Sequence, residues 1–378
     1  MGSLTIPFCL KTTSYGGRGL FAMEPIPKDT LLITCDPHVS VIYRKFRKEV
    51  CGQCFAYAFD SHRNYWNVKL NSQPSSGVWF CKEECRDAWV AEQDVEGLQG
   101  LMNAAIDKLA KNMKKPNASL PPFFVEQMRP QDITLEVHDL VWKNAEATWA
   151  RPEAKIPYLD ELELDTARFV VSGIIRRYLE DTIHSKSTLN WTALLKLQNN
   201  ELSHIRSRPY MLNSHLRIYG FLRKAIIPSL QPYVKTSETV RAILSRDQGN
   251  VFGLWDMSTE GDSEMLGWAM YVPGSYFNHS QLGLLFMSVT NNELTCLDCA
   301  PNVRKERIKR TMCFFTTRDV DAGEELCISY VDVQDDVVVR RAELPQNWYF
   351  DCACKRCEEE MASLGLVSVT PLPESLAD

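Results

Sequence analysis

Seven cysteines stand in three short-spaced groups, and their spacing is the strongest constraint that the sequence places on its fold. The groups are a C-x2-C, a C-x3-C and a C-x-C-x2-C, formed by Cys51 and Cys54, Cys81 and Cys85, and Cys352, Cys354 and Cys357. Each spacing lets neighbouring thiolates face one tetrahedral zinc ion. Four reduced thiols without a metal remain the alternative for the first two groups. Six further cysteines bring the total to 13, and Cys296 and Cys299 among them form another C-x2-C.

The rest of the composition narrows the class of protein. Residues 1–10 carry neither a charged segment nor an apolar one, so we expect no signal peptide, and no stretch nears the ~18 apolar residues of a membrane span. Cysteines in a chain without an export signal favour metal binding over disulfides. The net charge of −6, from 42 basic and 48 acidic residues, disfavours holding a nucleic-acid duplex by charge.

The pattern along the chain indicates a mixed α+β protein. Glycine and proline turns separate short strand-like segments in residues 1–45 and from about residue 250 onward, the last of them at 311–317 and 325–330. Residues 86–112 and 162–183 have helical character instead, with apolar side chains at helix spacing in the second segment. We therefore expect strands at both ends and helices in the middle.

Four motifs follow one another in an order that resembles the SET-domain methyltransferases. They are Gly17-Arg18-Gly19-Leu20-Phe21-Ala22, Phe277-Asn278-His279-Ser280, Gly323-Glu324-Glu325-Leu326-Cys327-Ile328-Ser329-Tyr330 and Phe350-Asp351-Cys352-Ala353-Cys354-Lys355-Arg356-Cys357. Each motif alone is weak, but the four in this order are specific. The cysteines between the first motif and the others make the chain similar to the SET-and-MYND family and its fungal relatives, in which a zinc module splits the SET domain.

The resemblance implies a SET β-fold with a pseudoknot, split by a zinc module and a helical insert and followed by a post-SET zinc site. The implied segments are a SET N-terminal part (1–50), a reduced MYND-like module (51–90), a helical linker and insert (91–248), a SET C-terminal part (249–335), a post-SET segment (336–362) and a flexible tail (363–378).

The family also implies which cysteines share a metal. A MYND module has four ligand pairs and two zinc ions, and the two pairs visible here resemble the first and third, which hold one zinc together. We therefore expect a reduced module with one structural zinc on Cys51, Cys54, Cys81 and Cys85. A second zinc is expected on Cys299, Cys352, Cys354 and Cys357, which gives two zinc ions per chain.

The family's active-site motif, N-H-S-C-x-P-N, is interrupted in this chain. Asn278-His279-Ser280 is followed by residues 281–298 and only then by Cys299-Ala300-Pro301-Asn302. Removing 281–298 restores the complete motif, so we interpret these residues as an insertion. A genuine surface loop and a retained intron are both open explanations. The insertion also leaves open whether Cys299 or Cys296 completes the second zinc site.

By resemblance, the chain transfers a methyl group from S-adenosylmethionine to a lysine amine of a protein. Tyr330 would be the catalytic residue beside the transferring methyl. The cofactor would be bound by Arg18, Gly19, Asn250, Ser275, Asn278, His279 and Phe350. Trp348 stands where the family often has a second channel tyrosine, and its larger ring predicts a narrower lysine channel and fewer methyl additions.

The partners follow from that activity. We expect a protein substrate, histone or non-histone, with no direct nucleic acid and no membrane, a monomer, and residence in the nucleus, the cytoplasm or both. The alternative is a catalytically impaired zinc adaptor that keeps the SET scaffold and mediates protein interactions, because 281–298 interrupts the motif. A nucleic-acid-binding zinc protein is a third candidate, which the acidic net charge disfavours.

Overall fold

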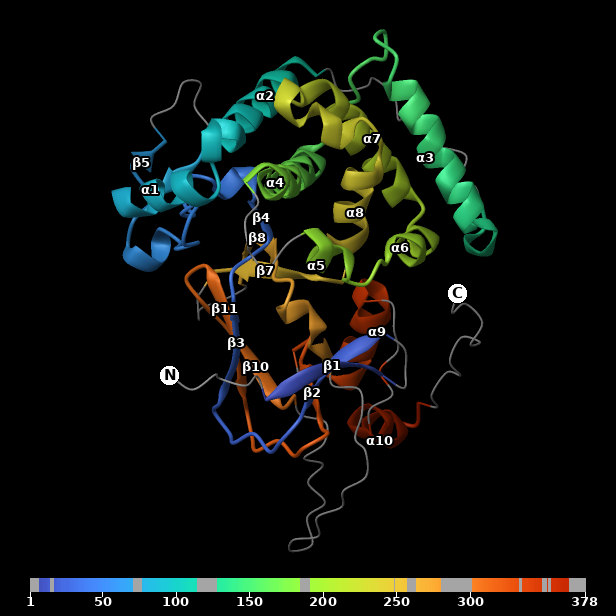
Figure 1. Ribbon diagram of the computed structural model, residues 1–378. Coiled ribbons are helices and arrows are strands. Elements are labelled where there is room, and N and C mark those ends of the chain that lie inside the picture. Colours follow the sequence, from blue (N-terminus) through green and yellow to red (C-terminus); the bar gives the residue numbers. More distant parts are fainter. Residues whose placement is uncertain are drawn as a thin grey trace, which may run out of the picture. The chain divides into compact units, whose positions relative to one another are not determined.

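The computed structural model describes most of the chain and divides it into two compact units (Figure 1). The described residues are 7–13, 17–70, 77–113, 128–183, 191–247, 249–256, 263–279, 301–332, 335–348, 352 and 355–366. The first unit comprises 1–35, 273–308 and 312–378, and the second comprises 36–272 and 309–311. Residues 281–298 and most of the predicted flexible tail lie outside the described residues.

A four-stranded sheet in the first unit joins segments from both ends of the chain. Its order is β1 (Phe8–Thr12), β2 (Arg18–Ala22), β12 (Glu325–Ile328) and β9 (Asn278–His279). The neighbours β1–β2 and β2–β12 are antiparallel, whereas β12 and β9 run parallel. The first motif of the sequence therefore lies beside the third, and the third beside the second.

A second sheet and two helices complete the first unit. The sheet has the order β10 (Val303–Ile308), β11 (Thr311–Thr316) and β3 (Leu31–Cys35), and the helices are α9 (Val337–Trp348) and α10 (Lys355–Ser363). Phe314 of β11 stacks on Phe277, with ring centroids 4.5 Å apart and an interplanar angle of 19°. Both rings are fully buried, so this pair forms part of the apolar core beneath the β9 motif.

The second unit combines a small sheet with a helical array. The sheet has the order β4 (Val39–Ile42), β8 (Met265–Met270) and β7 (Val251–Trp255), and all its pairs are antiparallel. The hairpin strands β5 (Val68–Lys69) and β6 (Trp79–Phe80) pair separately. The helices are α1 (Glu83–Glu92), α2 (Leu98–Asn112), α3 (Leu135–Trp149), α4 (Glu161–Ile183), α5 (Trp191–Leu195), α6 (Glu201–Ser207), α7 (Tyr210–Ala225) and α8 (Glu238–Asp247).

Helix α4 confirms the periodicity found in residues 162–183. It packs against β4 and against α2, α7 and α8, in the middle of the unit (Figure 1). Its apolar stripe is fully or almost fully buried, at Ala167, Phe169, Val170, Val171, Ile174 and Ile175. The stripe is therefore a core face, as the spacing of its apolar residues predicts.

The predicted helical segment 86–112 is divided in the structure. Helix α1 ends at Glu92 and α2 begins at Leu98, because Glu96 and Gly97 both adopt left-handed backbone conformations, with φ of 60° and 72°. The buried Asp94 carboxylate accepts the Gly100 backbone N–H at 2.8 Å and so fixes the start of α2. The α+β class and the helical middle are confirmed, but this segment is two helices rather than one.

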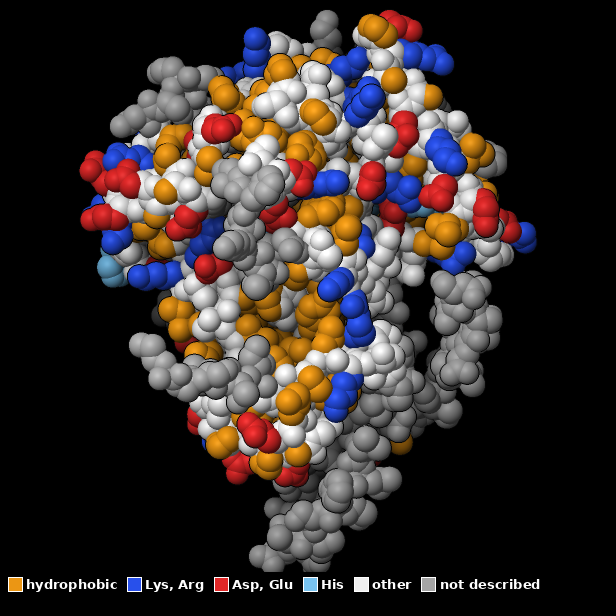
Figure 2. All heavy atoms as spheres, viewed as in Figure 1, with side chains coloured by type: hydrophobic (Ala, Val, Ile, Leu, Met, Phe, Trp, Pro, Cys, Tyr) orange, Lys and Arg blue, Asp and Glu red, His pale blue; other side chains and the backbone are white. Residues whose placement is uncertain are grey.

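Acidic and basic side chains are interspersed over the helices of the second unit on the face shown in Figure 2. Such a mixture is typical of a solvated surface, where isolated ion pairs contribute little to stability. Among the helices that the structure describes, none has the length and apolar character that crossing a membrane requires.

Candidate functional site

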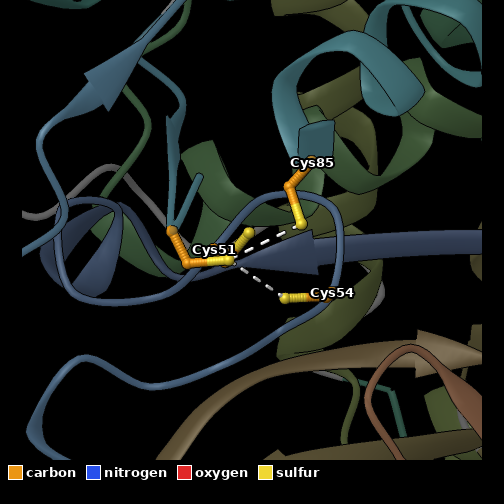
Figure 3. A group of neighbouring side chains, drawn as sticks. Cys51, Cys54 and Cys85 are labelled. Carbon is orange, nitrogen blue, oxygen red and sulfur yellow. Dashed lines mark hydrogen bonds between the residues drawn. The ribbon is translucent and has the colours of Figure 1, made fainter. Parts of the chain in front are cut away.

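Four cysteines of the second unit meet in one cluster. The Sγ atoms of Cys51, Cys54, Cys81 and Cys85 all lie within 4.8 Å of one another. Cys81 is 3.6 Å from Cys54 and 3.5 Å from Cys85, sulfur to sulfur. Figure 3 shows three of these side chains turned toward a common centre. Four thiolates around zinc, each at ~2.3 Å, stand slightly under 4 Å apart, so the cluster has the dimensions of a closed structural zinc site.

Local sequence brings these sulfurs together. Cys51 and Cys54 bracket a tight turn in which the backbone N–H of Phe55 donates to the carbonyl of Cys51, and Phe55 has a left-handed φ of 61°. Cys81 follows strand β6, and Cys85 lies in the first turn of α1. The cluster of apolar side chains around them includes Ala58, Trp66, Trp79, Phe80 and Trp89. Apolar side chains therefore frame the site, with Cys51 and Cys85 buried and Cys54 and Cys81 half-buried.

The C-terminal cysteines are only partly described. Cys352 and Cys357 are both buried in one apolar cluster with Val331, Val337 and Leu344. Cys299 and Cys354 lie outside the described residues, as do Cys296 and the insertion 281–298. The second zinc site, and the choice between Cys299 and Cys296, therefore stay predictions.

Strand β12 is the centre of the candidate active site in the first unit. Its Cys327 and Ile328 pair with Asn278 and His279 of β9. The Asn278 side-chain amide donates to the Arg18 carbonyl at 3.1 Å and to the Glu325 carboxylate at 2.7 Å. Asn278 thus ties together three strands that come from three of the four sequence motifs.

Gly19 is required by the same contacts. A β-carbon at this position would overlap the Glu325 carboxylate and would lie 2.7 Å from Nδ2 of Asn278. The family resemblance implies that Gly19 contacts the cofactor, where a glycine lets the backbone come close. The structure adds a second reason, because only glycine leaves room for the amide–carboxylate pair beside it.

Asn302 is a site residue that sequence reasoning missed. It is buried and makes three bonds to β12 and the residue before it: its amide donates to the Glu324 carboxylate (3.0 Å) and the Glu325 carbonyl (2.8 Å), and its oxygen accepts the Cys327 N–H (2.8 Å). The available signal was its position as the last letter of the interrupted motif. Asn278 and Asn302, on either side of the insertion, therefore both bond to β12 residues.

Tyr330 lies just beyond β12 and is held by its neighbours. Its hydroxyl donates to the Phe277 carbonyl at 3.0 Å, and its backbone N–H donates to Nδ1 of His279 at 3.1 Å. The tyrosine ring packs against those of His279 and Trp348, at centroid distances of 5.5 and 5.4 Å. The hydroxyl and ring therefore have one defined orientation.

Burial decides the protonation of these groups. It raises the pKa of Tyr330 above its ordinary value, with smaller contributions from Cys327 and Glu325, so the phenol keeps its proton at neutral pH. Burial also lowers the pKa of His279 to about 4. A neutral His279 is consistent with its Nδ1 accepting the Tyr330 N–H.

The remaining predicted cofactor-binding residues have fewer described contacts with the residues around β12. The Arg18 guanidinium lies over the Tyr276 ring, 5.4 Å from its centroid, and Ser275 lies in the same short 3-10 helix as Tyr276. Asn250 is buried in the second unit, where its amide donates to the Gln198 carbonyl at 3.1 Å. Phe350 lies outside the described residues. The cofactor roles of these residues stay predictions.

Comparison with known families agrees with this arrangement. The SET domain profile matches residues 17–331, a span that begins just before β2 and ends just after Tyr330. The match covers most of the chain, and the chain belongs to the SET-domain family.

Individual relatives refine the assignment. A SET and MYND domain-containing protein of Dictyostelium discoideum is 31% identical over 372 residues, covering 94% of this chain and 82% of the relative. The potential protein lysine methyltransferase SET6 of Saccharomyces cerevisiae is 29% identical over 385 residues, covering 94% and 96%. A solved structure, the SET domain of LSMT bound to lysine and AdoHcy, aligns with a TM-score of 0.33 at 14% identity, over 92% of this chain and 54% of that one. The resemblance to SET-and-MYND proteins is thereby confirmed.

Proposed function

We propose that this protein transfers a methyl group from S-adenosylmethionine to the side-chain amine of a lysine in a protein substrate. Membership of the SET-domain family and the similarity to a potential lysine methyltransferase support this activity. The observation that carries it is that residues from separate motifs meet at strand β12. Asn278 and Asn302 bond to that strand from both sides of the insertion, and Tyr330 follows it.

The residues of this chain fit such a reaction. Asn278, the Arg18–Gly19 backbone and Glu325 supply amide, carbonyl and carboxylate groups on adjacent strands, which suit the amino and carboxylate ends of the methionine part of the cofactor. The bound cofactor would supply an electrophilic methyl group on a sulfonium. We assign Arg18, Gly19, Ser275, Asn278 and His279 to its binding, with Asn250 and Phe350 as further candidates.

Tyr330 would orient the amine that attacks. Its hydroxyl donates its proton to the Phe277 carbonyl, and a phenol oxygen can also accept hydrogen bonds, here from the incoming amine, or contacts from a polarised methyl. The attacking amine must be neutral, whereas a free lysine has a pKa near ~10.4. Apolar surroundings and a neighbouring cation both lower that pKa. Alignment of the reacting atoms increases the reaction rate further.

We also infer that the cluster Cys51, Cys54, Cys81 and Cys85 holds one structural zinc, and that the post-SET cysteines hold another. A site closed by four thiolates has no open position, so the first zinc would stabilise the fold and take no part in methyl transfer. The substrate that fits the reaction is a protein lysine, with histones as the first candidates to test.

The experiment is a methyl-transfer assay with radiolabelled S-adenosylmethionine on histones and on cell lysate. It compares the full chain with Tyr330→Phe and with a deletion of 281–298. We expect transfer by the full chain and a loss on the order of 100-fold for Tyr330→Phe, because an oriented hydroxyl is removed while the buried ring stays. Tyr178→Phe is the matched control, since its hydroxyl bonds only to an exposed carboxylate at 3.4 Å among the contacts described.

The adaptor alternative makes a different prediction in the same assay. If the insertion disables the site, the deletion variant transfers methyl groups and the full chain does not. Calorimetry with S-adenosylmethionine separates the two cases further, because an adaptor that has lost the cofactor site gives no heat. Inactivity of both proteins, with no cofactor binding, would refute the proposed function.

A further inference from the structure

The first unit contains a lysine whose ammonium group bonds to the backbone of the residue that precedes the candidate catalytic tyrosine. Lys305 is on β10, and its Nζ donates to the carbonyl of Ser329 at 3.3 Å. Ser329 is the residue immediately before Tyr330, whose ring and hydroxyl we assign to the reaction. Burial is the main cause of the lowered pKa of His279, and the charge of Lys305 also lowers it, so the ammonium lies within electrostatic range of the histidine that accepts the Tyr330 N–H. Its ammonium therefore lies next to the backbone that leads into Tyr330 and near His279.

Two properties suit this lysine to accept a methyl group. Its side chain is exposed, so solvent can take its proton and reagents can reach it. The surrounding protein nevertheless partly desolvates the ammonium and lowers its pKa below the ordinary value. A lysine with a lowered pKa has more neutral amine at pH 7, which is the form that attacks.

We propose that Lys305 is an automethylation site, and that it accepts a methyl group in the active site of its own chain. This inference rests on the proposed function, which supplies S-adenosylmethionine as the donor. The Lys305 ammonium first loses a proton to solvent. Its nitrogen lone pair then forms a bond to the methyl carbon while the carbon–sulfur bond breaks, and the sulfur keeps that electron pair as S-adenosylhomocysteine leaves. The product is a protonated methylamine.

Reaction within one chain follows from the position of β10. The strand is in the same unit as β12 and Tyr330, so the acceptor and the site are held together at a high effective concentration. Methylation would also compete with the bond to Ser329, because each added methyl replaces an N–H donor. The modification would thereby alter the immediate surroundings of the catalytic tyrosine.

The test incubates the purified full chain with S-adenosylmethionine as the only added substrate and maps methyl groups by residue-resolved mass spectrometry. We expect methylation of Lys305 at a rate per molecule that does not change on dilution. Lys305→Arg should abolish this self-labelling, whereas Lys28→Arg, at an exposed lysine of the same unit, should retain it. Self-labelling that persists in Lys305→Arg, or that slows with dilution, would overturn the inference.

A second measurement needs no turnover. An amine-selective acylating reagent at neutral pH should modify Lys305 faster than Lys28, and S-adenosylhomocysteine should slow only the acylation of Lys305. If S-adenosylhomocysteine binds but leaves Lys305 acylation unchanged, the inference is wrong. Transfer to lysate proteins without any methyl on Lys305 would refute the automethylation and leave the proposed function standing. Absence of both transfer and cofactor binding would refute both.

Discussion

The two candidate sites of this protein are assembled in opposite ways. The cysteine cluster of the second unit draws all four sulfurs from residues 51–85, within one hairpin, one turn and one helix. The site around β12 joins residues 18–19, 278–279, 302 and 325–330, which are widely separated in the sequence. In the cysteine cluster the joining element would be a metal ion. Around β12 it is a set of hydrogen bonds to buried backbone groups and half-buried carboxylates.

This difference means that different perturbations should break the two sites. A metal-centred site fails as a unit when one ligand is removed, because three thiolates hold zinc poorly. A hydrogen-bonded site loses stability in steps, each on the scale of one or two unsatisfied buried groups. Measurements on variants of each site can therefore test the comparison directly.

The largest effect is expected at the cysteine cluster. Cys85→Ser should release about one zinc ion per chain and destabilise the second unit by several kcal/mol, since the metal stabilises only the folded module. Cys9→Ser, at a cysteine of β1 outside the cluster, is the matched control and should keep its zinc. Metal content by atomic absorption and thermal unfolding measure the result. Equal zinc in the two variants would mean that the cluster is a set of reduced thiols.

A smaller loss of stability is expected on removing the Asn302 side chain, which bonds to β12. Asn302→Ala leaves the buried Cys327 N–H without its acceptor and removes two donors, which should cost about 3 kcal/mol and strongly reduce methyl transfer. Asn112→Ala, at an exposed helix end, removes a bond only to the Lys108 carbonyl and should cost under ~1 kcal/mol. Denaturant unfolding gives both values. An Asn302→Ala protein as stable as the control would show that β12 does not depend on this residue.

The same contrast explains what the sequence could predict. Zinc-ligand spacing is local, so Cys51, Cys54, Cys81 and Cys85 could be grouped from the sequence, and the structure brings all four together. The α4 stripe is also local and was predicted for the same reason. By contrast, the bonds of Glu325 to Asn278 and to Asn302 join residues that are far apart in the sequence. A periodic pattern of apolar residues cannot predict such pairs. The pattern of residues 86–112 does not predict the break between α1 and α2, because one of its two left-handed residues, Glu96, is of a type that rarely adopts this conformation.

Gly19 tests how tightly the β12 site is packed. Gly19→Ala places a methyl group against the Glu325 carboxylate and the Asn278 amide, and we expect a loss of about 1–3 kcal/mol together with weaker cofactor binding. In a Glu325→Ala background the same change should cost less, because the closest obstacle is gone. The double-mutant cycle is read by thermal unfolding and calorimetry with S-adenosylmethionine. Additive losses would indicate that the two residues do not share one packed contact.

The smallest effect is expected at Trp348, which concerns the product and not the fold. Its indole packs on the Tyr330 ring with centroids 5.4 Å apart, at the end of α9, and it is only half-buried. A smaller ring would leave more room beside the tyrosine, where the acceptor amine and its added methyl groups must fit.

Trp348→Phe should therefore shift the products toward higher methylation states by a few-fold, on the scale of a pocket that changes by a few atoms. Mass spectrometry of the methylated substrate measures the ratio of mono-, di- and trimethyl-lysine. Phe169, whose ring lies in the other unit, should give no such shift when changed to Leu, and serves as the control for general loosening. Efficient trimethylation by the unchanged protein would contradict the narrowing role of Trp348. It would also show that the Trp348 ring packs against Tyr330 without limiting the number of methyl groups added.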